Sequence, residues 1–238
     1  MLPLFKSDYS IGKSILTVNK ESDDSGPSSI FEIAKREGLK QVILVEDTLT
    51  GFLKSQKNSS DLGISLVFGL RISFSDDLSN DSDPHKVIIF AKNSQGCRIL
   101  NQIYSHAFTQ REGVLDYKFL KNIWNEEALK LCVPFYDSFI FNNLMFFGTC
   151  ILNIDFTKPD FFIEENDLPF DSMVAEKVKE YCNSKQYNII FSKSIYYNKR
   201  EDFAAYQTYK CICSRSSFGK GSGLDKPNLD HCSSKEFS

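Results

Sequence analysis

The sequence has few histidines, no excess of basic charge and no long apolar run. Its 238 residues include only three histidines, and the net charge is −3. No apolar run approaches the roughly 20 residues that a membrane-spanning helix needs, and the N-terminus lacks a charged segment followed by an apolar one. We therefore expect a cytoplasmic protein that makes no use of a membrane.

The charge balance does not favour direct binding of nucleic acid. Acidic residues number 31 against 28 lysines and arginines, whereas a protein that binds the phosphate backbone concentrates basic residues on one face. We expect contact with nucleic acid to be indirect only.

The seven cysteines are an odd number scattered through the chain, which is not typical of a secreted disulfide framework. Cys211 and Cys213, with His231 and Cys232 downstream, could form a zinc site. Structural zinc sites usually use closer pairs such as CxxC. We therefore favour reduced thiols at the end of a helix, followed by two polar residues in a tail.

Hydrophobic residues make up 42% of the chain and include 21 phenylalanines, enough for a large core. The continuous apolar run at 41–46 predicts a strand buried on both faces, and hence a parallel sheet. By pattern, further strands are expected at 63–74, 85–91, 129–135, 138–143, 150–156 and 187–192, and helices at 30–38, 93–108, 170–184 and 199–213, with a short helix or loop at 49–58.

Strands and helices alternate without an internal repeat, which predicts an α/β barrel or an open sheet. Ser29 and Glu32 form a capping-box pattern at the start of a helix that Gly38 is placed to end. Asn93 is a candidate N-cap for the longest helix. The inward face of that helix is expected to carry Cys97, Leu100, Ile103, Tyr104 and Ala107.

The order of the segments resembles the polymerase-and-histidinol-phosphatase (PHP) domain that opens the α subunit of bacterial replicative DNA polymerase III. The resemblance is carried by "KSDYS", "IFEIAKREGLKQVILVEDTLTG", "GISLVFGLRISF", "HKVIIFAKNSQGCRILNQIYSHAF" and "YNIIFSKSIYYNKREDFAAYQ", in the family's order. It implies a single domain with a distorted seven-fold β/α barrel, over residues 1–213, followed by a Ser- and Gly-rich tail at 214–238. Active members hold a metal cluster at the carboxyl ends of the strands and hydrolyse phosphate esters or DNA ends.

The family's metal ligands are replaced in this chain. Leu4 and Lys6 stand at the family's His-x-His pair, Val45 and Glu46 at its Asp-His, and Arg71 at its glutamate. A lone carboxylate does not hold a catalytic cluster, and cations repel a divalent metal.

The family's late Asn-Asp-x-His falls on Lys193, Ser194 and Tyr196. We therefore expect no catalytic residue, no bound metal and no cofactor. The loop of Ser7 to Gly12 would keep the shape of a metal-binding corner without its ligands.

The three histidines do not replace the missing ligands. We expect His85 in a loop before a strand, His106 near the end of a helix and His231 in the tail, with none placed to join the others.

The basic residues at the lost ligand positions have a second possible use. Lys6, Arg71 and Lys193 could form a phosphate clamp, although buried charges are more often paired, here for example with Glu46 or Asp8.

Aromatic residues could stack on bases, although in so phenylalanine-rich a chain most aromatics belong to the core. The candidates are Phe161, Phe162, Tyr196, Tyr197 and Phe203.

The resemblance implies a catalytically silent PHP-like domain that acts as a structural or interaction module of a DNA replication polymerase. Its partner would be a polymerase or proofreading exonuclease polypeptide. The chain would be either a stand-alone protein, such as a phage encodes beside a split polymerase and which then acts in the host cytoplasm, or an excised fragment. The alternatives are a phosphoesterase or 3'-5' proofreading nuclease with an atypical site and, less favoured, a small-ligand sensor. Candidate surface anchors are Tyr196, Tyr197, Phe203 and Tyr206, beside Lys199 and Arg200.

Overall fold

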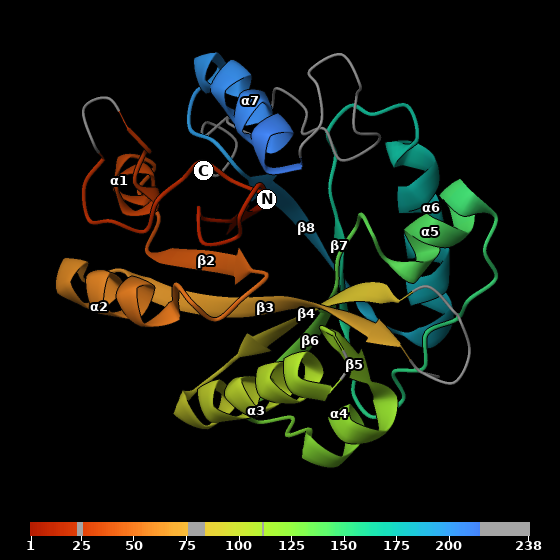
Figure 1. Cartoon of the computed structure of the whole chain (residues 1–238). Helices are drawn as coiled ribbons and strands as arrows, with labels where there is room; N and C mark the ends of the chain where they lie inside the picture. Colours follow the sequence, from red (N-terminus) through yellow and green to blue (C-terminus); the bar gives the residue numbers. More distant parts are fainter. Residues whose placement is uncertain (23–25, 76–83, 111, 215–238) are drawn as a thin grey trace. The chain divides into compact units, whose positions relative to one another are not determined.

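The computed structural model describes residues 1–22, 26–75, 84–110 and 112–214 (Figure 1). The expected tail, with His231 and Cys232, therefore lies outside the described residues, except for Ser214.

Strands and helices alternate along most of the chain. The strands are β1 (Leu2–Phe5), β2 (Gln41–Glu46), β3 (Ser65–Ser75), β4 (His85–Ala91), β5 (Val114–Asp116), β6 (Leu129–Val133), β7 (Asp160–Ile163) and β8 (Asn188–Ile195). The helices are α1 (Ile30–Arg36), α2 (Phe52–Leu62), α3 (Ser94–Gln110), α4 (Tyr117–Ile123), α5 (Phe139–Phe146), α6 (Asp171–Lys185) and α7 (Phe203–Ser214), which a short 3-10 turn precedes.

The chain packs as two compact units that share two strands. Unit 1 contains Met1–Phe68, Glu165–Leu168 and Ser192–Ser238, and unit 2 contains Gly69–Glu164 and Pro169–Phe191. The strands β3 and β8 each run through both units, so neither unit is a continuous segment of sequence.

The strand pairings form a closed ring. Neighbours follow the order β2-β1-β8-β7-β6-β4-β3, β3 also pairs with β2, and β5 pairs with β3 outside the ring. This mixed α/β ring of seven strands confirms the expected barrel. The sheet is not wholly parallel, because β4 runs antiparallel to both β3 and β6.

The strand β2 matches its predicted range. Its side chains from Val42 to Glu46 are all buried, as a strand covered on both faces requires. Leu44 lies opposite Phe5 of β1 in parallel register, and both are core residues.

Half of the predicted capping box is present at α1. The Ser29 hydroxyl accepts from the backbone N–H groups of Phe31 and Glu32, at 3.2 and 3.3 Å. The Glu32 carboxylate instead accepts from Ser22 N–H at 3.0 Å, and so holds the preceding loop. Gly38 adopts a φ of 68°, in the left-handed region that favours glycine, and follows the helix as expected.

The longest helix, α3, begins as predicted, because the Asn93 side chain accepts from Gly96 N–H at 3.0 Å. Leu100, Ile103 and Ala107 are buried, whereas Cys97 and Tyr104 are only half-buried. A Cβ at Gly96 would lie 2.2 Å from the Ala128 carbonyl oxygen, so only glycine allows this close approach to the backbone before β6.

Two predicted strands are wrong. The segment 138–143 lies mainly in α5, where the Ser138 hydroxyl accepts from Phe141 N–H at 3.2 Å and caps the helix. Residues 150–156 contain no strand. A short apolar run has the same pattern in a strand and in a buried helix, so the capping serine decided the outcome. The elements β5, α4 and β7 were not predicted from the sequence.

No helix among the described residues is both long and apolar enough to cross a membrane.

Candidate functional site

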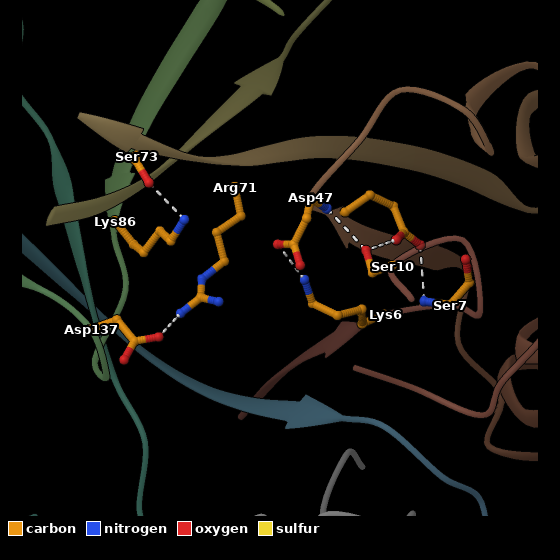
Figure 2. Close-up of polar contacts among 9 residues, drawn as sticks. Lys6, Ser7, Ser10, Asp47, Arg71, Ser73, Lys86 and Asp137 are labelled. Atoms are coloured by element: carbon orange, nitrogen blue, oxygen red, sulfur yellow. Dashed lines mark hydrogen bonds and ion pairs between the residues drawn. The ribbon is translucent and has the colours of Figure 1, made fainter. Parts of the chain in front are cut away.

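The corner after β1 is organised around the carboxylate of Glu46. Because β1 and β2 are adjacent parallel strands, Glu46 at the end of β2 lies beside the loop that leaves β1. Ser7 N–H donates to one Glu46 oxygen at 2.9 Å, and the Ser10 hydroxyl donates to the other. Asp47 N–H in turn donates to the Ser10 hydroxyl oxygen at 3.0 Å (Figure 2). The loop thus closes on the carboxylate.

Glu46 is completely buried. Burial raises the pKa of its carboxyl above the usual value, and the hydrogen bonds from Ser10 and Ser7 and the charge of Lys6 act in the opposite direction. Both carboxylate oxygens of Glu46 accept hydrogen bonds from groups of the protein.

Lys6 forms an ion pair with Asp47 at 2.8 Å (Figure 2). The lysine is 5% exposed, so its charge is compensated inside the protein, as buried charges must be. The prediction of a salt bridge at Lys6 is therefore confirmed in kind, but the partner in this contact is Asp47 rather than Glu46 or Asp8. Asp47 follows Glu46 directly in the sequence, and this adjacent carboxylate could have been named as a partner for Lys6.

The other residues of unit 1 that the resemblance singled out lie in the core, on the strand β8 or in an aromatic stack. Leu4 and Val45 are buried apolar side chains. Ser194 lies opposite Leu4 in the β1–β8 register, next to the buried Lys193. The Tyr196 ring stacks on Tyr206, with centroids 6.0 Å apart and planes 9° from parallel.

Arg71 is placed in unit 2, where it lies in β3 and forms an ion pair with Asp137 (Figure 2). Lys86, on the antiparallel neighbour β4, donates to the Ser73 hydroxyl at 2.7 Å, and its backbone N–H donates to the Asp137 carbonyl. Lys6 and Lys193 belong to unit 1 and Arg71 to unit 2, so the phosphate clamp stays a prediction.

The two described histidines serve the packing of unit 2. His85 was predicted in a loop, but it is the first residue of β4. Its ring lies 3.0 Å from the Asn142 amide nitrogen, within hydrogen-bonding distance. His106 is near the end of α3, as predicted. It contacts Asp116 at 2.9 Å and stacks on Phe119.

Most of the candidate stacking residues are core residues. Phe161, Phe162 and Tyr197 are at most 2% exposed, which confirms the favoured prediction that these aromatic residues belong to the core and leaves no room for them to stack on bases. Tyr206, a candidate surface anchor, is also buried, because its ring packs against Tyr197 at 5.3 Å. The Phe203 ring also packs against Tyr197, with the two ring centroids 6.0 Å apart.

The side chains at this corner do not fit a divalent metal. The ammonium group of Lys6 is paired with the Asp47 carboxylate, and both oxygens of Glu46 accept from Ser7 and Ser10. Within residues 1–22, 26–75, 84–110 and 112–214, no three His, Cys, Asp or Glu side chains lie close enough together to hold a metal ion. Cys211 and Cys213 are free thiols.

Comparison with known proteins gives one distant structural match to report. No protein-family model matches the chain, and neither does any curated protein. A crystal structure of a presumed metal-dependent phosphoesterase from Bifidobacterium adolescentis is 15% identical, with a TM-score of 0.27. The match covers 45% of this chain and 35% of that chain. A TM-score this low does not establish a common fold.

Proposed function

We propose that this protein is a catalytically silent PHP-like domain that acts as a structural or interaction module of a DNA replication polymerase. The observation that carries the proposal is the Lys6–Asp47 ion pair beside the fully hydrogen-bonded Glu46. In the resemblance that the sequence carries, Lys6 and Glu46 correspond to metal-ligand positions of active members, and here both side chains are engaged by groups of the protein. A metal-dependent phosphoesterase reaction needs a cation with open coordination positions at that point.

The partner in this proposal is a polymerase or proofreading exonuclease polypeptide, and nucleic acid is reached only through it. The net charge of −3 supports this, because the chain brings no excess of basic residues to a phosphate backbone.

The test is affinity purification of the tagged full chain from its native cell under nuclease treatment, followed by mass spectrometry. We expect a polymerase or exonuclease polypeptide to be recovered without DNA. In parallel, the purified chain is incubated with p-nitrophenyl phosphate and with single-stranded DNA in the presence of Mn²⁺, and no turnover is expected.

Glu46→Gln is the matched control for the hydrolysis assays. An activity that the parent shows and this variant loses belongs to the chain itself rather than to a contaminant. Such an activity, with no replication polypeptide recovered, would overturn the proposal in favour of the phosphoesterase or nuclease alternative.

A further inference from the structure

Two cationic side chains of unit 2 share one face of the sheet. In the antiparallel pairing of β3 and β4, Ser73 lies opposite Lys86 and Arg71 lies opposite Ile88. Residues that lie opposite each other, or two apart along a strand, point to the same face. Arg71 and Lys86 are therefore diagonal neighbours, about 7–8 Å apart at the Cα atoms, so one small ligand can reach both charges. Figure 2 shows them grouped with Ser73 and Asp137.

Both cations are partly removed from water. The Arg71 side chain is 16% exposed, and Lys86 is half-buried. Two like charges repel each other more strongly where water screens them less, and a nearby anion offsets this repulsion. This face of β3 and β4 therefore favours a negatively charged group.

The Asp137 carboxylate is a negatively charged group that can leave the site. It pairs with Arg71, but its side chain is 42% exposed, and ion pairs in contact with water contribute little. The backbone of Asp137 is held separately, because its carbonyl oxygen accepts from Lys86 N–H at 3.0 Å. The carboxylate can thus move away from the guanidinium group while the residue keeps its place.

The Ser73 hydroxyl adds a donor between the two cations. Its oxygen accepts from Lys86 Nζ at 2.7 Å, so its own hydrogen points away from the ammonium group. Within the part of the chain that the structure describes, this hydrogen has no acceptor. A guanidinium fork, an ammonium group and a hydroxyl donate from three separate groups, which suits a tetrahedral phosphate better than a planar carboxylate with two oxygens.

We infer that Arg71, Ser73 and Lys86 bind a phosphate group, either as inorganic phosphate or as a phosphate monoester. The Asp137 carboxylate occupies the Arg71 part of the site until the anion displaces it. The site uses residues of unit 2 alone, unlike the clamp predicted from the sequence. The inference goes beyond the proposed function, because a domain without catalysis can still hold a ligand.

The test is isothermal titration calorimetry of the purified full chain with inorganic phosphate, adenosine 5'-monophosphate and acetate as probes. Arg71→Gln and Lys86→Gln each remove one cation, and Asp137→Asn removes the competing carboxylate. The φ of Asp137 is 61°, and asparagine tolerates this left-handed region well, so Asp137→Asn should keep the fold. Arg98→Gln is the matched control, because it makes the same change at an exposed position of α3.

The parent should bind inorganic phosphate more tightly than acetate. Arg71→Gln and Lys86→Gln should each weaken the affinity for phosphate by about tenfold or more, whereas Asp137→Asn should strengthen it by about threefold. Arg98→Gln should leave it unchanged. A gain of affinity in Asp137→Asn cannot come from a protein that fails to fold, so the test stays decisive even if a cation variant unfolds.

The inference would be overturned if neither the parent nor Asp137→Asn bound phosphate, if acetate bound as tightly as phosphate, or if Asp137→Asn weakened binding. Tighter binding of adenosine 5'-monophosphate than of inorganic phosphate would assign the site to a phosphate monoester, and the reverse order would assign it to the free anion. None of these outcomes depends on the recovery of a replication polypeptide, so this inference and the proposed function can fail separately.

Discussion

At the scale of single residues, the most informative side chain is Glu46. Its two carboxylate oxygens accept hydrogen bonds from the Ser7 backbone N–H and from the Ser10 hydroxyl. Such an acceptor fixes the loop after β1, because an unpaired donor in this buried place would be costly. Glu46 is therefore a structural residue in this chain, and its effects are expected in stability rather than in turnover.

Glu46→Gln should lower the free energy of unfolding by about 1–3 kcal/mol, because the amide nitrogen of glutamine faces a donor where an oxygen accepted before. Urea denaturation followed by tryptophan fluorescence measures this. The control is Glu180→Gln, which removes a carboxylate from the exposed ion pair with Lys177 and should change the stability little. Equal stability of Glu46→Gln and the parent would contradict the structural role.

The stability difference between the parent and Glu46→Gln should depend on pH. Because burial raises the pKa of Glu46 in the folded protein, the folded state holds the proton more tightly than the unfolded chain, whose pKa is about 4.5. The stability that Glu46 contributes is then greatest below that pH and falls as the pH rises through the pKa of the folded state. Glutamine does not titrate, so the stability difference between parent and Glu46→Gln should narrow as the pH rises above about 4.5. A difference that widens over this range would show that the pKa is lowered instead.

At the scale of elements, the adjacent strands β1 and β2 position the corner. Both are apolar, and their parallel register brings Phe5 opposite Leu44. The residues just beyond this pair, Lys6 and Glu46, are polar and buried, so the corner depends on the core beneath it. Disturbing that core should therefore weaken the whole element pair.

Leu44→Ala should destabilise the protein by about 2–5 kcal/mol, because Leu44 is 1% exposed and its truncation leaves a cavity in the core. Thermal and urea denaturation measure the loss. The matched control is Leu53→Ala, the same change at an exposed position of α2, which should have a small effect. A Leu44→Ala variant that melts like the parent would contradict the packing of β2.

At the scale of the whole molecule, the polar groups at the expected ligand positions already have partners within the protein. Lys6 pairs with Asp47 in unit 1, and Arg71 pairs with Asp137 in unit 2. The carboxylates of Asp47 and Asp137 are thus each engaged by a cation, and within the described part of the chain no group of three or more His, Cys, Asp or Glu side chains could hold a metal ion.

Protein purified with added manganese or zinc should therefore carry well below one metal equivalent per chain. Elemental analysis after gel filtration measures this, and Glu46→Gln, which lacks the one retained carboxylate, should give the same value. Two or more tightly bound ions in the parent would contradict the silent site and favour the phosphoesterase alternative.

The sequence by itself determined the elements whose pattern is long or carries its own end signals. Residues 42–45 are apolar throughout, and Ser29 and Asn93 indicate the starts of the helices that they cap. That Leu4, Lys6 and Arg71 supply no metal-binding side chain could also be predicted, because it depends only on which residue types are present. The same information did not distinguish helix from strand at 138–143, where a short apolar run fits either.

Only the tertiary structure decided which charges meet. Asp47 and Asp137 are ordinary acidic residues in the sequence, and their ion pairs with Lys6 and Arg71 join positions far apart along the chain. The same holds for the aromatic residues. Tyr197 and Tyr206 are core residues, whereas Phe146 and Phe147 are exposed. Composition and local pattern limit which residues can be buried, but the pairing of strands and helices determines which of them are, because burial depends on what the fold brings against each side chain.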